Sequence, residues 1–124
     1  MDDKKQILLE ERMEGLASLD ASPNGELVAK LIALYESSTK DGLALLKTYI
    51  AEGDARVPKQ AHSLKSSSAN LGLERVTYIF QEIENFHYTG ECLKKAMIQL
   101  DEEFKLGIEA LHSFYNQKYA KTIK

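Results

Sequence analysis

Hydrophobic residues recur every three or four positions along most of the chain, in five segments separated by short polar breaks. This spacing places apolar side chains on one face of a helix. It predicts helices over residues 3–19, 26–52, 57–71, 73–87 and 91–119. Strand-type alternation is poor and the chain holds only 2 prolines, so the pattern favours an all-α fold.

Four long amphipathic segments joined by short breaks are typical of an antiparallel up-down four-helix bundle. We expect an additional N-terminal helix, residues 1–22, to pack on a bundle of residues 23–120, with a tail at 121–124. The apolar stripes are expected to contain Ile7, Leu8, Met13, Leu16 and Leu19; Leu27, Leu31, Leu34, Tyr35, Ser38, Leu45, Leu46 and Tyr49, broadened by Val28, Ile32 and Ile50; Val57, Ala61, Leu64, Ser68 and Leu71; Val76, Ile79, Phe80, Ile83 and Phe86; and Leu93, Met97, Leu100, Phe104, Ile108, Leu111 and Tyr115.

Glycine and proline set the ends of several segments. Gly53 and Gly72 are expected just beyond helix C-termini, where glycine adopts the left-handed conformation easily. Pro58 lacks a backbone N–H, so the third helix either begins near Val57 with Pro58 in its first turn, or is capped by Asp54 and distorted. The sequence leaves both open.

Composition narrows the class of protein. A chain of 124 residues, 44% hydrophobic and 28% charged, fits one globular domain. The net charge of −3 offers no general attraction for nucleic acid. Cys92 is the only cysteine, which excludes an intramolecular disulfide and suits a reducing compartment. No apolar run is long enough to span a membrane and no signal peptide is evident, so we expect a cytoplasmic protein that does not bind membranes.

His62 is the candidate chemical residue. On the third helix it lies about 145° from the centre of the apolar stripe, toward solvent. Lys65, Ser66 and Ala69 share its side of the helix. The neutral imidazole is a nucleophile near pH 7, Lys65 could neutralise phosphoryl oxygens, and the small neighbours leave room for a partner. The alternative is an ordinary surface histidine.

The residues around this histidine resemble a known signature. Histidine-containing phosphotransfer (HPt) domains have a His, a hydrophobic residue two positions on, a Lys three on, a run of small residues, and then a hydrophobic residue and Gly. The matching run is His62-Ser63-Leu64-Lys65-Ser66-Ser67-Ser68-Ala69-Asn70-Leu71-Gly72. A looser likeness extends over residues 26–115, including Glu74-Arg75. Two departures are Ser66, where the family most often has Gly, and the closeness of Pro58 to His62.

The resemblance implies that His62 accepts a phosphoryl group from an aspartyl-phosphate receiver domain and passes it to another. Lys65 would stabilise the phosphate, and receivers would dock over Ser66, Ala69 and Asn70. The partners would be response-regulator receivers or a hybrid histidine kinase, whose receiver domain would hold the Mg²⁺; this chain would need no metal or cofactor. We expect a monomeric carrier, not an enzyme, either free-standing or part of a hybrid kinase.

Glu84 has more than one possible role. A carboxylate on the helix after His62 could accept an imidazole N–H and orient the ring, although a solvated glutamate is the alternative. Glu84 with His87, and Glu109 with His112, also match the Glu-x-x-His spacing of di-iron bundles. Glu109 is expected to face solvent, which disfavours a metal site, and His87 and His112 are interpreted as ordinary boundary histidines.

A second hypothesis belongs to another functional class. A helical adaptor could bind a receiver or kinase through the same face without being phosphorylated. The pairing of His62 with Lys65 argues against it, because an adaptor has no need for a nucleophile.

Overall fold

All the regular secondary structure in the described residues is helical. The computed structural model describes residues 5–85 and 90–119, the side chains of 90–92 excepted. Its elements are α1 (Glu10–Ser18), α2 (Glu26–Ala51), α3 (Val57–Asn70), α4 (Glu74–Glu84) and α5 (Gly90–Tyr119). The predicted all-α fold, an N-terminal helix with four further helices, is confirmed.

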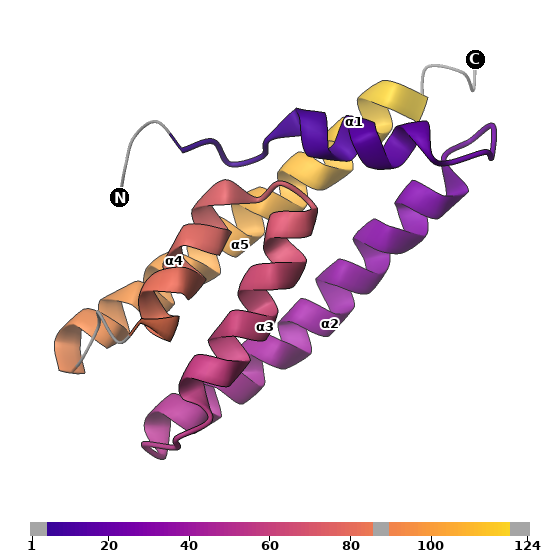
Figure 1. The fold of residues 1–124 in the computed structure, drawn as a ribbon. Helices are drawn as coiled ribbons and strands as arrows, with labels where there is room; N and C mark the ends of the chain where they lie inside the picture. Colours follow the sequence, from indigo (N-terminus) through magenta and orange to yellow (C-terminus); the bar gives the residue numbers. More distant parts are fainter. Residues whose placement is uncertain (1–4, 86–89, 120–124) are drawn as a thin grey trace.

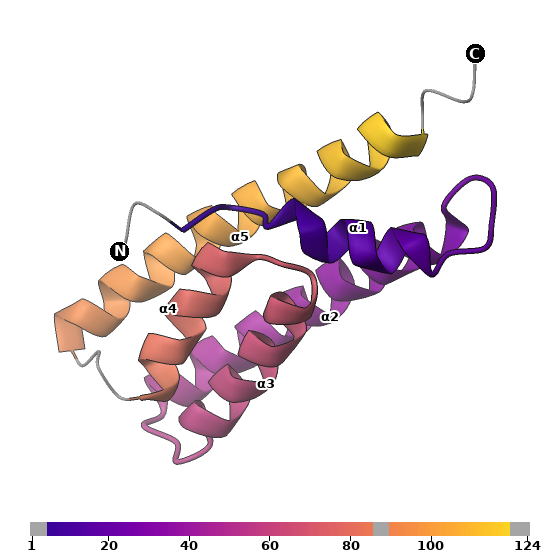
Figure 2. The ribbon, with the colours of Figure 1, turned by 45° about the horizontal axis from the view of Figure 1, so that its top comes forward.

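The helices α2 to α5 alternate in direction, and α3 and α4 are joined by a tight turn (Figure 1). The shorter helices α3 and α4 pack against the long helices α2 and α5. The helix α1 crosses the end of the bundle where α2 begins and α5 ends (Figure 2). Two contacts fix this end: Tyr115 Oη donates to the Asn24 carbonyl at 2.8 Å, and Lys118 Nζ lies 2.7 Å from Glu14 Oε1. The far end carries the α2–α3 turn.

The expected inner faces of α3, α4 and α5 are confirmed for the residues that the structure describes. The buried members are Ala61, Leu64, Ser68 and Leu71 around α3; Val76, Ile79, Phe80 and Ile83 on α4; and Met97, Leu100, Phe104, Ile108 and Leu111 on α5. Val57, Leu93 and Tyr115 are partly buried against this core. Phe86 lies outside the described residues.

The expected inner face of α2 is confirmed for Val28, Ile32, Tyr35 and Leu46, but it lacked Thr39 and Leu43 and included leucines that lie outside the core. The buried side chains are Val28, Ile32, Tyr35, Thr39, Leu43 and Leu46. Three leucines expected inside, Leu27, Leu34 and Leu45, are 43%, 66% and 42% exposed. The helix carries apolar residues around more than half its circumference, so periodicity alone does not fix its rotation, and the contacts with the rest of the bundle decide it.

The N-terminal helix is shorter than predicted. It begins at Glu10, and residues 5–9 form a non-helical strap. The Leu9 N–H donates to the Gly72 carbonyl at 2.7 Å, so the strap is pinned to the α3–α4 turn and its backbone is not free to continue the helix. Met13 is fully buried, whereas Leu19, also expected on the apolar side, is 75% exposed.

The start of α3 resolves the two alternatives for Pro58. The helix begins at Val57 and Pro58 falls in its first turn. Asp54 instead accepts the Arg56 backbone N–H at 2.8 Å and the Arg56 guanidinium. These bonds lower the pKa of Asp54 to about 2. Gly53 and Gly72 have φ of +63° and +83°, as expected for residues that follow helix ends.

None of the helices in the described part of the chain has the length and apolar character required to cross a lipid bilayer.

Candidate functional site

The inner face of α3 packs closely against α2. Gly42 has no side chain, and a Cβ built there would meet Leu64 Cδ2 at 2.6 Å. Gln60 Nε2 donates to the Gly42 carbonyl at 3.1 Å. Deeper in the core, the Tyr35 and Ser68 hydroxyls are 2.7 Å apart. These contacts fix the rotation of α3, so its opposite face is held toward solvent.

His62 lies on that outer face, as its helical position predicts. Its side chain is 58% exposed, and Nδ1 lies 2.8 Å from Oε2 of Glu84, the last residue of α4. An ionised carboxylate can only accept a hydrogen bond, so Nδ1 carries the proton. In the neutral ring Nε2 therefore has a lone pair, and it is the nitrogen that Glu84 does not use.

Glu84 contacts a second partner. Its Oε1 lies 2.6 Å from Lys65 Nζ, and the Lys65 and Glu84 side chains are each 24% exposed. The pKa of Glu84 is held below its ordinary value, chiefly by the hydrogen bond from Lys65, with a further lowering by His62. One ionised carboxylate thus joins the imidazole and the ammonium. We call His62, Lys65 and Glu84 the histidine triad.

Small side chains surround the histidine on α3. Ser66 and Asn70 are exposed and Ala69 is partly buried. Helical spacing predicted that Ser66 and Ala69 share the side of His62, and the resemblance implied a docking face over Ser66, Ala69 and Asn70. Ser66, one turn after His62, is too short to cover the imidazole, whose side chain is 58% exposed.

A hollow of about 280 Å³ adjoins this face on the α2 side. Ser67 and Asn70 of α3 line it together with Leu31 and Leu34 of α2. Leu34 is 66% exposed here. Sequence reasoning missed this hollow because it turned Leu34 inward. The signal that could have revealed it is the excess of apolar residues on α2.

His112 is the other histidine that the structure describes. Its Nε2 lies 3.1 Å from Glu36 Oε1, and Lys40 Nζ lies 3.2 Å from Glu36 Oε2. Glu109 is exposed, as expected. Within residues 5–85 and 93–119, no three His, Cys, Asp or Glu side chains gather into a group that could hold a metal ion. His87 and the side chain of Cys92 lie outside the described residues.

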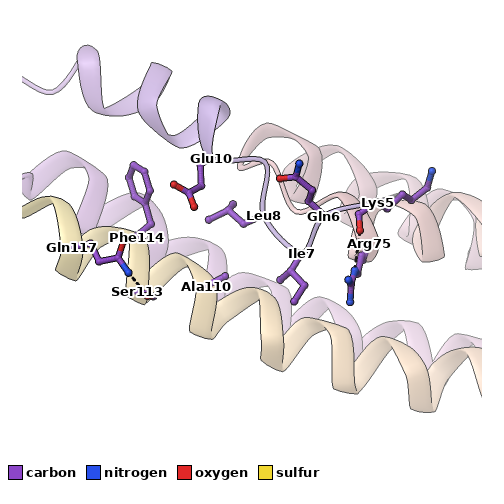
Figure 3. Close-up of a pocket in the computed structure, with 10 residues that line it drawn as sticks. All are labelled: Lys5, Gln6, Ile7, Leu8, Glu10, Arg75, Ala110, Ser113, Phe114 and Gln117. Carbon is purple, nitrogen blue, oxygen red and sulfur yellow. Dashed lines mark hydrogen bonds between the residues drawn. The ribbon is translucent and has the colours of Figure 1, made fainter. Parts of the chain in front are cut away.

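A second hollow, of about 480 Å³, lies between the N-terminal strap and α5 (Figure 3). Arg75 lines it from α4, where its Nε donates to the Lys5 carbonyl at 3.1 Å. Ile7 of the strap and Phe114 of α5 are among its apolar lining residues (Figure 3). None of the histidine triad lines this hollow, so it is separate from the candidate site.

Sequence reasoning found each member of the triad but not how they join. The spacing of His62 and Lys65 placed both on one side of α3, and Glu84 was considered as a ring-orienting residue. The ion pair between Lys65 and Glu84 was not expected.

Comparison of the chain with protein-family models, curated proteins and solved structures found no match.

Proposed function

We propose that this protein is a phosphorelay carrier of the histidine phosphotransfer type, with His62 as the phosphoacceptor. The observation that supports this best is the geometry of the ring: Glu84 occupies Nδ1 at 2.8 Å, and the ring is exposed on a face of small side chains. A nucleophile that must enter another protein's active site needs that exposure, and fixing one nitrogen directs attack to the other.

The proposed transfer needs no proton to leave the ring. The Nε2 lone pair attacks the phosphorus of an aspartyl phosphate on a docked receiver domain. The N–P bond forms, the P–O bond breaks, and its electron pair remains on the aspartate as a carboxylate. The proton stays on Nδ1 against Glu84. In the return step a second receiver's aspartate attacks phosphorus, and the ring leaves with its Nε2 electron pair restored.

Lys65 is proposed to stabilise the phosphoryl oxygens. Lys65 follows His62 by one helical turn on α3, and its ammonium lies 2.6 Å from Glu84 Oε1. A cation so placed offsets negative charge that develops on a transferring phosphoryl group. The Mg²⁺ that assists transfer is proposed to belong to the receiver, so the carrier would contribute a nucleophile and a cation and would not be an enzyme in its own right.

The receiver is proposed to dock over Ser66, Ala69 and Asn70 and the adjoining hollow. The exposed Leu34 offers an apolar contact beside a polar, uncharged stretch of α3. Interfaces of transient signalling partners are small and of mixed polarity, which suits this surface. We further propose that the carrier acts as a monomer in the cytoplasm.

The test is incubation with phosphorylated receiver domains, followed by intact-mass analysis. We expect one added phosphoryl group, labile in acid and stable in alkali, which is absent from His62→Gln. His112→Gln, in which the other described histidine is changed, should be labelled like the parent. Lack of label from several different receivers would contradict the proposal and favour an adaptor that binds through the same face without phosphorylation.

A further inference from the structure

Glu84 is more than a hydrogen-bond acceptor, because it carries a full negative charge at the ring. Its carboxylate is ionised, and its two oxygens are divided between His62 Nδ1 at 2.8 Å and Lys65 Nζ at 2.6 Å. An amide side chain could accept the same Nδ1–H bond and orient the ring equally well. Any effect of Glu84 beyond orienting the ring must therefore come from its negative charge.

The consequence lies in the phosphorylated form. When Nε2 bonds to phosphorus and Nδ1 keeps its proton, the ring becomes a cation. A carboxylate 2.8 Å from Nδ1 stabilises that cation. A protonated ring leaves phosphorus as neutral imidazole, whereas a deprotonated ring must leave as an imidazolate, which is a far poorer leaving group.

The same carboxylate also engages the local ammonium. Lys65 pairs with Glu84 Oε1, so part of its charge is already neutralised when a phosphoryl group arrives. Lys59, exposed one turn before His62, is the other cation on this face of α3. No hydrogen bond or ion pair reaches the ring from the described residues of α2, the second helix that packs against α3. The charge balance at the ring is therefore set mainly by Glu84.

We infer that Glu84 keeps the His62 phosphoryl group labile, by holding the phosphorylated ring in its protonated form and by sharing Lys65. This inference rests on the proposed function and specifies its regulation: the carrier would be built to give phosphate up quickly to a receiver or to water, and not to store it. The bond that breaks is N–P, its electron pair returns to Nε2, and the acceptor oxygen forms the new P–O bond.

The experiment labels His62 chemically, so that it does not depend on a cognate receiver. Phosphoramidate is used as the phosphoryl donor on full-length protein in which His87 and His112 are replaced by Gln. The decay of the phosphohistidine is followed by intact mass and ³¹P NMR between pH 5 and 9, a range chosen to bracket neutrality. Glu84→Gln keeps the acceptor oxygen and removes the charge; Glu109→Gln is the matched control at an exposed glutamate of α5.

We expect the half-life at neutral pH to lengthen roughly three- to tenfold in Glu84→Gln, as loss of a nearby charge predicts. The midpoint of its pH–rate profile should move to lower pH, because the protonated ring has lost its counter-charge. Glu109→Gln should decay like the parent. The effect should persist when Lys65 is also replaced by Ala, since the carboxylate acts on the ring directly. A half-life or profile midpoint unchanged in Glu84→Gln would overturn the inference, because an orienting role alone moves neither.

Two combinations separate this inference from the proposed function. If receivers label His62 but Glu84→Gln decays like the parent, the carrier function stands and the inference falls. If no receiver labels His62 while the chemically formed phosphohistidine is longer-lived in Glu84→Gln, the charge effect stands and the carrier function falls. Far-UV circular dichroism confirms that each variant is folded before its decay is compared.

Discussion

Two histidines of this protein have closely matched surroundings. His62 and His112 are 58% and 54% exposed, and each contacts a glutamate on another helix, at 2.8 Å and 3.1 Å. Each of those glutamates also pairs with a lysine, Lys65 in the first case and Lys40 in the second. An exposed imidazole with a carboxylate and an ammonium nearby is therefore not in itself distinctive.

The difference is in which atoms are used. Glu84 engages Nδ1 of His62, the nitrogen nearer the backbone, whereas Glu36 engages Nε2 of His112, the outer nitrogen. Lys65 belongs to the same helix as His62, one turn away, while Lys40 lies on the helix of the glutamate, four residues from Glu36. Of the two described histidines, only His62 combines an outer nitrogen that the described residues leave without a partner with a cation on its own helix face. His112 thus provides an internal control for the proposed chemistry.

Replacing each of the two lysines separately should give the largest difference in the rate of phosphoryl transfer. Lys65→Ala is expected to slow phosphoryl transfer from a receiver about 100-fold, because the positive charge that offsets the transferring group is lost. Lys40→Ala should leave the rate unchanged. Rapid-quench measurement with one phosphorylated receiver checks both variants. Equal rates for parent and Lys65→Ala would remove the lysine from the proposed site.

A bulky residue one turn after each histidine tests access. Ser66→Arg should reduce the second-order rate of transfer from a receiver about tenfold or more, because an arginine would obstruct the approach to His62. Asn116→Arg, at the equivalent exposed position after His112, should have no effect. Labelling by phosphoramidate, which needs little room, should survive in Ser66→Arg. Loss of both kinds of labelling would point to damage of the ring environment and would contradict a docking role for Ser66.

The helices α3 and α2 differ in how well their orientation could be predicted from the sequence. On α3 the apolar stripe is narrow and the opposite face is polar, so the outward position of His62 could be predicted from spacing. On α2 apolar residues cover more than half the helix, and the rotation that exposes Leu34 depends on contacts with α3 and α5. The hollow that Leu34 lines with Ser67 and Asn70 could therefore not be predicted.

Contacts between residues that are distant in the sequence could not be predicted either. The end of α4 brings Glu84 to both His62 and Lys65, and its position depends on the length of the α3–α4 turn. The N-terminal strap is held by a backbone bond from Leu9 to Gly72, which no local pattern reveals. Helix content follows from periodicity, but such long-range hydrogen bonds follow only from the packed fold.

The close packing of α3 against α2 can be tested by substitution of two helical glycines. Gly42→Ala should lower the free energy of unfolding by about 1–2 kcal/mol, because the new methyl group would meet Leu64 Cδ2 at 2.6 Å in the packed core. Gly15→Ala, where no heavy atom of the described structure lies within 4 Å of the new Cβ, should raise it by about 0.5–1 kcal/mol. Urea unfolding measures both. A stabilised Gly42→Ala would show that α3 is not seated there as closely as the contacts indicate.

The smallest expected effect concerns the two carboxylates themselves. The pKa values of Glu84 and Glu36 both lie below the ordinary 4.5, but the main cause is the hydrogen bond from Lys65 for Glu84 and from His112 for Glu36. A lowered pKa in the folded state means that each carboxylate stabilises the protein above pH 4.5, and that this contribution is lost as the pH falls through the folded value.

Carboxyl ¹³C chemical shifts, followed from neutral pH into acid, measure both groups in one sample. The pKa of Glu84 should rise toward its ordinary value more in Lys65→Ala than in His62→Gln, whereas that of Glu36 should rise more in His112→Gln than in Lys40→Ala. The order is reversed because the hydrogen bond from Lys65 is the main cause of the lowered pKa of Glu84, and that from His112 is the main cause for Glu36. If both carboxylates responded most to loss of the histidine, Lys65 would not be the principal partner of Glu84. Glu84 would then not share Lys65 in the way inferred above.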